Sequence, residues 1–157
     1  MNNSEIYSNL KRIKEYASEE NIPIMQDDGI EFLTTFIIKK HIKNILEIGT
    51  AIGYSAIMMA LCDKDIHVTT IERNEIRYLE ALKNIKKFNL EDRVTLIFND
   101  ALSVNLQDEY DLIFIDAAKG KNKEFFNQFE NNLAMDGYII TDRKLSATIQ
   151  YAALIYV

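Results

Sequence analysis

The chain has 157 residues, a length that is sufficient for one domain with a buried core and too short for two. Apolar residues make up 48% of it and charged residues 27%. No apolar run approaches the roughly 20 residues of a membrane-spanning helix, and the amino terminus lacks the pattern of a secretory signal. The single cysteine, Cys62, excludes an intrachain disulfide framework and a multi-cysteine zinc site, so we expect a cytoplasmic protein without membrane contact.

The net charge of −6 argues against non-specific binding to nucleic acid, because neutralising phosphates usually requires a basic face. It does not exclude a local basic patch. Lysines gather in three groups along the chain, at positions 39–43, 83–87 and 119–123. Exposed helix faces and loop ends are the ordinary explanation of such groups.

Two amphipathic helices are expected at the amino-terminal end. Apolar residues at helical spacing predict the first helix over residues 4–20, and the only proline, Pro23, interrupts the pattern. Asp27 or Asp28 can cap a second helix, whose apolar residues again share one face. These helices should form an N-terminal cap over residues 1–43.

From residue 44 onward, short apolar runs alternate with helical stretches. The expected strands are residues 45–48, 67–71, 94–98, 112–115 and 138–140, and the expected helices are 54–63, 74–89 and 123–132. Such alternation is typical of βαβ units, in which helices cover both faces of a parallel sheet. The connection 99–110 is short for a helix and is expected to be a turn or one loose helical turn. We expect one α/β domain with a mostly parallel, Rossmann-like sheet in the order 3-2-1-4-5, its core over residues 44–142.

The first strand runs into a glycine turn that leads to a helix. Backbone amides and a helix N-terminus can face a ligand there. A dinucleotide fingerprint starting at Gly49 would need glycines where Ala51 and Tyr54 stand, and the Walker lysine pattern is absent as well. The remaining signal is a tight turn between Gly49 and Gly53, with Glu47 two places before it. A turn without any ligand remains an alternative.

Acidic residues follow three more of the expected strands. In nucleotide-binding α/β folds, an acidic side chain at the position of Glu72 can accept both hydroxyls of a ribose. Asp100 can accept from the exocyclic amine of adenine, and Asp116 lies at the mouth of the fourth strand. The alternatives are a solvated carboxylate for Glu72 and helix caps for the two aspartates.

These segments together resemble a known family. Residues 47–55, 71–73, 99–101 and 114–119 look like successive motifs of the cation-dependent class I O-methyltransferases. That family includes the catechol and caffeoyl-coenzyme A enzymes and the bacterial tRNA 5-hydroxyuridine methyltransferases, which this chain resembles most. The likeness extends from about residue 22 to residue 142.

The resemblance implies S-adenosylmethionine as cofactor, Mg²⁺ as a second cofactor, and a set of site residues. The implied cofactor contacts are Met25, Glu47, Gly49, Thr50, Gly53, Ser55, Glu72, Arg73, Asp100, Ala101 and Asp116. Asp116 and Asp142 would bind Mg²⁺, and Asp116 and Lys119 would be catalytic, with Lys119 as the general base. A flexible surface cation is the alternative for Lys119.

The resemblance ends after Asp142. The family pattern has Asn as the third metal ligand at the next position, where this chain has Arg143, a side chain that cannot donate a lone pair to a metal. Residues 143–157 form an atypical tail without the family's antiparallel strands, and their apolar end could be a strand or a short helix. We therefore expect poor Mg²⁺ binding.

The expected acceptor is a hydroxyl with a vicinal oxygen. One candidate is 5-hydroxyuridine in tRNA, and a catechol-like small molecule is the alternative. An inactive, truncated remnant that still binds the cofactor is a third reading. A homodimer is left open.

Overall fold

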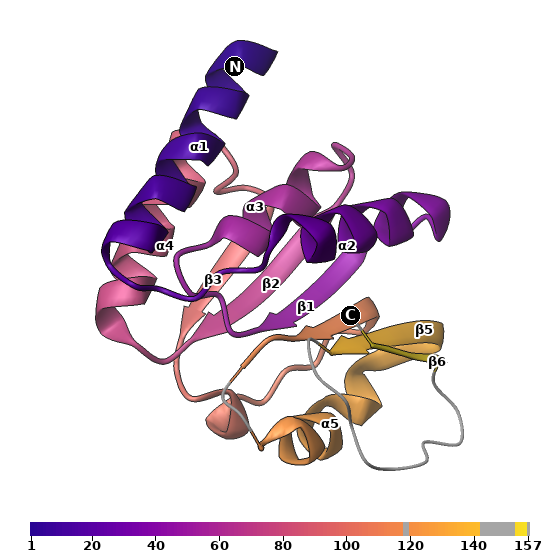
Figure 1. Cartoon of the computed structure of the whole chain (residues 1–157). Coiled ribbons are helices and arrows are strands. Elements are labelled where there is room, and N and C mark those ends of the chain that lie inside the picture. Colours follow the sequence, from indigo (N-terminus) through magenta and orange to yellow (C-terminus); the bar gives the residue numbers. More distant parts are fainter. Residues whose placement is uncertain (118–119, 142–152, 157) are drawn as a thin grey trace.

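A six-stranded sheet lies at the centre of the fold in the order β3-β2-β1-β4-β5-β6 (Figure 1). The computed structural model describes residues 1–117, 120–141 and 153–156, the last four through their backbone alone. The strands are β1 (Asn44–Ile48), β2 (His67–Glu72), β3 (Val94–Phe98), β4 (Tyr110–Ile115), β5 (Leu133–Thr141) and β6 (Ala153–Tyr156). Every pair of neighbouring strands among them is parallel.

Helices cover both faces of this sheet, as the sequence predicted. They are α1 (Asn3–Glu19), α2 (Asp27–Lys39), α3 (Tyr54–Leu61), α4 (Glu75–Lys87) and α5 (Asn122–Phe129), with the short turns η1 (Ala101–Ser103) and η2 (Glu130–Asn132). Helices α1 to α4 pack in one apolar cluster, and α5 packs with η1 in the other. Helices α1, α3 and α4 lie within about two residues of their predicted bounds, and the final turn of the last predicted helix is η2. Helix α2 begins at Asp27 and its N-cap is Gln26, so the predicted cap by Asp27 or Asp28 is wrong.

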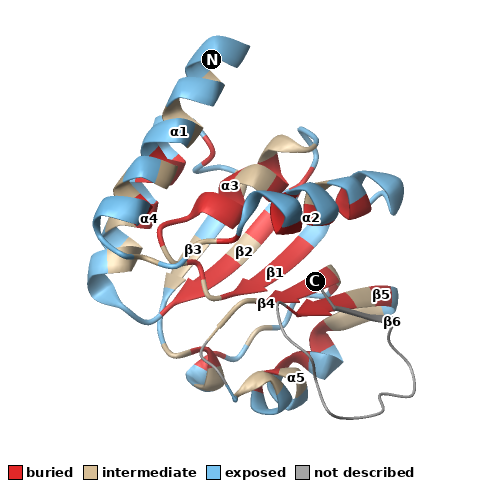
Figure 2. Cartoon of the chain, viewed as in Figure 1, coloured by how far each residue is buried: buried red, intermediate tan, exposed pale blue. Residues whose placement is uncertain are grey.

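Alternation along the central strands explains why both faces are buried. Ile45 belongs to the cluster beneath α1 to α4, whereas its neighbour Leu46 belongs to the cluster beneath α5. Phe114 and Ile115 on β4 divide in the same way. Successive side chains of a strand point to opposite faces, so a strand covered on both sides is an apolar run. Figure 2 shows these central strands buried, with exposed residues on the outer sides of the helices.

The carboxyl-terminal part of the sheet differs from the prediction in detail. Strand β5 begins at Leu133, ahead of the expected residues 138–140, and its pairing with β4 shifts register between Tyr110 and Leu112. The sequence left the end of the tail open between a strand and a helix. In the structure it is strand β6, which lies parallel to β5.

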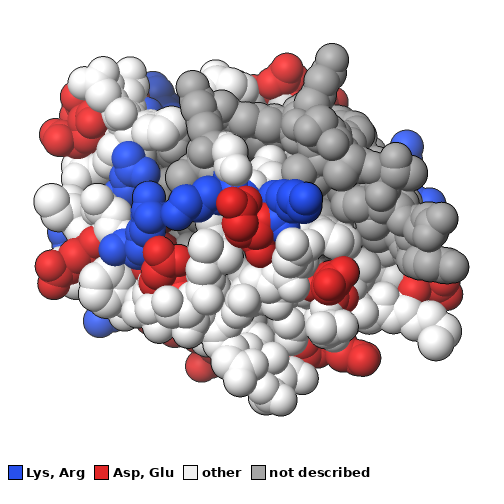
Figure 3. All heavy atoms as spheres, turned by 90° about the horizontal axis from the view of Figure 1, so that it is seen from below, with Lys and Arg blue, Asp and Glu red and all other residues white. Residues whose placement is uncertain are grey.

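Two further features concern the length of the helices and the charge on the surface. No helix within the described residues is long and apolar enough to cross a membrane. Figure 3 shows Lys and Arg side chains in a row across one face of the molecule, with acidic side chains between and beside them.

Candidate functional site

The turn after β1 brings the ends of three strands together. Gly49 has a φ of +100°, and a Cβ atom there would lie 2.0 Å from the carbonyl oxygen of Asp116. The amides of Gly49 and Thr50 both donate to the carbonyl of Ile71, at 3.0 and 3.2 Å. The amide of Asp116 donates to the carbonyl of Ile48 at 2.9 Å. Only glycine fits between β1 and β4 at this point, which explains why the turn begins with it.

The same turn ends at Gly53, the residue before α3, which has a φ of +87°. Ala51 between the two glycines also has a positive φ, +48°. A chain that doubles back this tightly exposes its backbone amides at the carboxyl edge of the sheet. One of them, the amide of Ala51, donates to Glu72 Oε2 at 2.8 Å.

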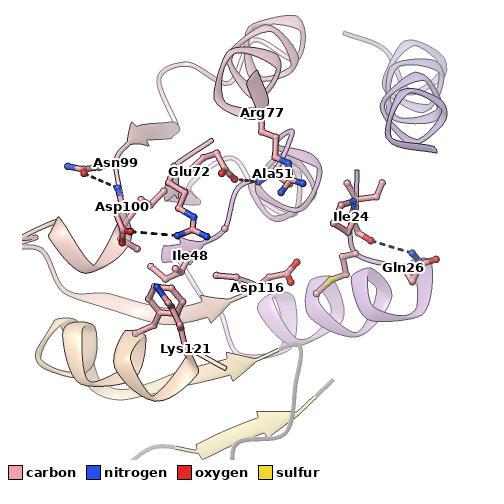
Figure 4. Close-up of a pocket in the computed structure, with 18 residues that line it drawn as sticks. Ile24, Gln26, Ile48, Ala51, Glu72, Arg77, Asn99, Asp100, Asp116 and Lys121 are labelled. Atoms are coloured by element: carbon pink, nitrogen blue, oxygen red, sulfur yellow. Dashed lines mark hydrogen bonds and ion pairs between the residues drawn. The ribbon is translucent and has the colours of Figure 1, made fainter. Parts of the chain in front are cut away.

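A cavity of about 400 Å³ opens beside this turn, at the carboxyl ends of β1, β2 and β4 (Figure 4). It is the place where ligands bind in open α/β sheets. Its walls include seven of the residues proposed for cofactor contact: Met25, Gly49, Glu72, Arg73, Asp100, Ala101 and Asp116. Four others, Glu47, Thr50, Gly53 and Ser55, do not line it.

Glu72 is held at the cavity wall by two backbone amides. Ala51 N–H donates to Oε2 and Asn74 N–H donates to Oε1, each at 2.8 Å. Glu72 is 7% exposed as a residue, so these bonds partly replace the hydration of its carboxylate. Each carboxylate oxygen has a second lone pair, which a ligand hydroxyl can use.

Asp100 caps the turn that follows it, which is the alternative that the sequence offered, and it also lines the cavity. Its Oδ1 accepts from Leu102 N–H at 2.9 Å and caps η1. Its Oδ2 lies 3.8 Å from a terminal nitrogen of Arg73, and both side chains are well exposed, so this ion pair is weak. The cap fixes the carboxylate at the cavity wall, where a ligand amine could donate to it.

Glu47 forms a buried hydrogen-bond network behind the turn. Its Oε1 accepts from the Ser55 hydroxyl, and its Oε2 accepts from Thr70 Oγ1 at 2.5 Å. Thr70 Oγ1 also lies 2.6 Å from Thr50 Oγ1. The pKa of Glu47 is raised to about 7, mainly by burial and to a smaller extent by the charges of Asp116 and Glu72, while the hydrogen bonds from the two hydroxyls act in the opposite direction. The group ties β1, β2 and α3 together and does not reach the cavity.

Several wall residues were not among the predicted contacts. They are Pro23, Ile24, Gln26, Ile48, Ala51, Ile71, Arg77, Asn99, Ala117, Lys121 and Phe125. The break at Pro23 marked the 23–26 segment as irregular, but not as a wall of the cavity. Phe125 is 5% exposed and occupies an apolar position of α5, so the sequence pattern does not distinguish it from an ordinary core residue. The sequence indicated Lys121 only as one lysine of the group at positions 119–123, without a place in the site.

The predicted metal and base residues lie largely outside the described residues. Lys119, Asp142 and Arg143 fall in the segments 118–119 and 142–152, so of this group only Asp116 can be placed. Among the described residues, no three His, Cys, Asp or Glu side chains come close enough to hold a metal ion.

Comparison with known proteins adds independent findings. A family model described as O-methyltransferase matches residues 1–148. A caffeoyl-CoA O-methyltransferase of Populus kitakamiensis is 30% identical over 140 residues, which cover 84% of this chain and 59% of that protein.

Solved structures agree with this match. A Staphylococcus aureus protein described provisionally as a caffeoyl-CoA O-methyltransferase shares 41% identity and superposes with a TM-score of 0.80, over 85% of this chain and 65% of that one. A Bacillus cereus O-methyltransferase in complex with SAH (S-adenosylhomocysteine) shares 30% identity, with a TM-score of 0.78 and the same coverage of both chains. The chain thus spans about three fifths of the length of these relatives.

Proposed function

Because the chain belongs to the O-methyltransferase family, we propose that it binds S-adenosylmethionine in the cavity and transfers the methyl group to a hydroxyl oxygen. One observation carries the proposal. Glu72, the last residue of β2, and Asp100, which follows β3, line a cavity that the Gly49 turn also lines (Figure 4). This arrangement places hydrogen-bond acceptors where the ribose hydroxyls and the adenine amine of an adenosine ligand could donate.

The described residues fit the cofactor in size and in chemistry. A cavity of about 400 Å³ lies within the range of roughly 300–1,000 Å³ that is usual for small-molecule sites. Glu72 has lone pairs for the two ribose hydroxyls, and Asp100 can accept from the amine of adenine. Met25 and Phe125 supply apolar wall in the same cavity.

Methyl transfer from a sulfonium is an in-line displacement. The acceptor oxygen forms a bond to the methyl carbon while the carbon–sulfur bond breaks, and its electron pair stays on sulfur. The protein has to hold the oxygen in line and take its proton. We propose Lys119 as the base and Asp116, at the end of β4, as its neighbour in the site. The Gly49 turn and Met25 would keep water away from the cofactor.

For magnesium, we propose ligands but no step of the reaction. When bound, the ion would hold two neighbouring acceptor oxygens and lower the pKa of the attacking hydroxyl. Asp116 and Asp142 are the proposed ligands. The described residues do not form this site by themselves, so we assign no step of the reaction to the metal.

For the acceptor, we propose 5-hydroxyuridine in tRNA, whose 5-hydroxyl has the 4-carbonyl as its neighbouring oxygen. Three cationic side chains, Arg73, Arg77 and Lys121, line the cavity of a chain whose net charge is −6. Such cations can contact phosphates beside a reacting nucleotide, and phosphate contacts position a nucleic acid. A catechol-like small molecule is the second candidate, supported by the match to a caffeoyl-CoA enzyme and by the net charge.

One experiment separates the two acceptors. The protein is incubated with methyl-labelled cofactor and either 5-hydroxyuridine-containing tRNA or catechol, over a range of salt concentrations. If tRNA is the acceptor, label enters the tRNA and the reaction weakens with salt. Transfer to catechol alone would overturn the tRNA assignment. Cofactor binding without transfer to either would support the third reading, an inactive remnant.

A matched pair of variants sharpens this test. Arg77→Ala removes a cation from the cavity wall, whereas Lys86→Ala removes an exposed cation from the same helix, α4. We expect Arg77→Ala to raise the KM for tRNA several-fold and Lys86→Ala to leave it unchanged. Equal effects of the two variants would assign the interaction to net charge, and not to the cavity.

A further inference from the structure

An exposed apolar surface lies at the β3 edge of the sheet. Phe98, the last residue of this edge strand, is 49% exposed, and the centroid of its ring lies 5.1 Å from that of Tyr78 on α4. Leu79 and Leu82 are exposed as well, and their helical spacing places them on the flank of α4 that carries Tyr78. We call these four side chains the β3–α4 patch. The proposed function leaves the patch without a role.

The β3–α4 patch adjoins the cavity through both of its elements. Arg77 and Asn99 line the cavity (Figure 4), and each is the chain neighbour of an aromatic residue of the patch, Tyr78 or Phe98. Consecutive Cα atoms are only about 3.8 Å apart. A ligand that extends from the cavity over this edge of the sheet would therefore meet the exposed ring of Phe98.

Charged side chains of both signs surround the patch. Two of the cations are paired with carboxylates: Arg73 with Asp100 at 3.8 Å, and Lys83 with Glu80 at 3.1 Å. Glu75 adds an exposed carboxylate at the start of α4. Arg77 differs, because among the described residues no carboxylate forms an ion pair with it. The surface beside the cavity therefore offers exposed rings and one guanidinium free to bind a phosphate, but no broad basic face.

Single-stranded RNA has the groups that this surface can bind. Its unstacked bases stack on aromatic side chains, and its phosphates accept hydrogen bonds from Arg. A double helix keeps its bases stacked inside and is bound largely through phosphates, so it would make little use of the Phe98 ring. An exposed ring beside a single available cation thus favours an unpaired segment of a few nucleotides over a duplex.

We propose that the β3–α4 patch binds a nucleotide close to the methyl acceptor in single-stranded RNA. The base of this nucleotide stacks on Phe98, whose ring Tyr78 supports from α4, and Arg77 contacts a phosphate of the same segment. The patch thereby selects an unpaired loop over a duplex. Phe98 is not among the residues that line the cavity, so it is an RNA contact and not a catalytic residue. The inference rests on the proposed function, with tRNA as the acceptor.

Binding of a labelled RNA hairpin with 5-hydroxyuridine in its loop tests the inference. Fluorescence anisotropy measures the dissociation constant in the presence of S-adenosylhomocysteine, so no turnover is needed. Phe98→Leu keeps an apolar side chain but removes the ring, and we expect it to raise the dissociation constant on the order of tenfold. Phe98→Trp keeps an aromatic ring and should bind the hairpin at least as tightly as the wild type.

Three controls separate stacking from other effects. Phe32 on α2 is also an exposed phenylalanine in contact with another ring, that of Phe36, but it does not line the cavity, so Phe32→Leu should leave hairpin binding unchanged. Phe98→Leu should bind S-adenosylhomocysteine as the wild type does in calorimetry. It should also keep the salt dependence of hairpin binding, whereas Arg77→Ala should lower the logarithmic slope by about 0.7, the value for one phosphate of a single strand.

The outcomes separate this inference from the proposed function. A wild type that does not bind the hairpin overturns tRNA as the acceptor, and the inference with it. If the wild type binds and Phe98→Leu binds equally tightly, the inference alone is wrong. Equal losses in Phe98→Leu and Phe32→Leu, or a parallel loss of affinity for S-adenosylhomocysteine, would overturn it too. Sedimentation of the free proteins covers the other occupant, a second copy of the chain: a dimer that Phe98→Leu converts to a monomer would assign the patch to self-association and not to RNA.

Discussion

The Glu72 carboxylate holds the turn and also lines the proposed cofactor cavity. It accepts the amides of Ala51 and Asn74, and it lies on the cavity wall with lone pairs left for a ribose. We expect Glu72→Ala to weaken binding of S-adenosylhomocysteine by about 1–3 kcal/mol, the usual loss for a charge-assisted hydrogen-bond partner. Calorimetry measures this directly. Glu75→Ala, an exposed change three residues away, is the control, and an unchanged affinity in Glu72→Ala would refute the ribose assignment.

Glu47 should also leave a signature in the pH dependence of stability. Its pKa is about 7 in the folded chain, above its ordinary value of 4.5, so between these pH values the folded state keeps a proton that the unfolded state has released. The contribution of Glu47 to the free energy of unfolding therefore falls as pH rises through this window, by up to about 3 kcal/mol. Denaturant unfolding of Glu47→Gln between pH 5 and 8 should lack this fall. A parallel pH profile in both proteins would contradict the shifted pKa.

The sequence located the acidic residues of the site but not all of their roles. Glu72, Asp100 and Asp116 follow strands, and parallel strands end at one edge, so their meeting at one cavity could be predicted. Glu47 was expected to contact the cofactor, yet its side chain points to the network behind the turn. The position of Glu47 two residues before Gly49 does not reveal whether its side chain faces the cavity or the protein interior behind the turn.

At the scale of elements, the β1–α3 turn is the most constrained segment. A Cβ at Gly49 would meet the Asp116 carbonyl oxygen at 2.0 Å, whereas at Gly53 the nearest atom, the Ala81 Cβ, is an ordinary 3.5 Å away. Both glycines have positive φ. We expect Gly53→Ala to lower the free energy of unfolding by about 1–2 kcal/mol through backbone strain alone. Gly49→Ala should cost about 3 kcal/mol or more, because β1 and β4 must also separate.

Denaturant unfolding of the two variants measures this difference. The pair is matched, since each variant adds one methyl group to a left-handed position of the same turn. Equal losses in the two would mean that strands β1 and β4 yield easily at this point. The close approach to Asp116 would then not explain why the turn begins with glycine.

Most of the helices and strands could be predicted because their signals are local. The apolar runs of β1 and β4, buried on both faces, and the helical spacing in α1 and α2 need no tertiary information. What the sequence missed depends on packing between distant segments. Arg77 on α4, Lys121 just before α5 and Phe125 on α5 line the cavity, although no local pattern in the sequence marks them as wall residues. The pairing of β6 beside β5 likewise depends on which edge is free, and the tail sequence does not encode that by itself.

At the scale of the whole molecule, the O-methyltransferase family model matches residues 1–148, and the departure that the sequence predicts begins only at residue 143. The Gly49 turn and the acidic wall lie before residue 117, within the part that relatives share, while the chain spans only 59% of the Populus protein and 65% of the Staphylococcus aureus one. The residues proposed for cofactor contact lie at or before residue 116, whereas those proposed for metal binding and as the base lie from residue 116 onward. We therefore expect that the two capacities can be lost separately.

Magnesium binding is therefore the property that best tests the departure. Asp116 directly follows β4 and Asp142 directly follows the neighbouring strand β5 in the sequence, so we propose that their two carboxylates could share an ion. Arg143, however, stands where the family pattern has the third ligand and adds a permanent cation. Mg²⁺ holds on to its waters and needs negative or carbonyl oxygens to displace them, so we expect weak binding by the wild type. Arg143→Asn should tighten it on the order of tenfold, as measured by Mg²⁺ calorimetry. Lys144→Asn removes a neighbouring cation without restoring a ligand, and should have a much smaller effect. Tight, stoichiometric Mg²⁺ binding by the wild type would contradict this and would show that Arg143 does not disturb the metal site.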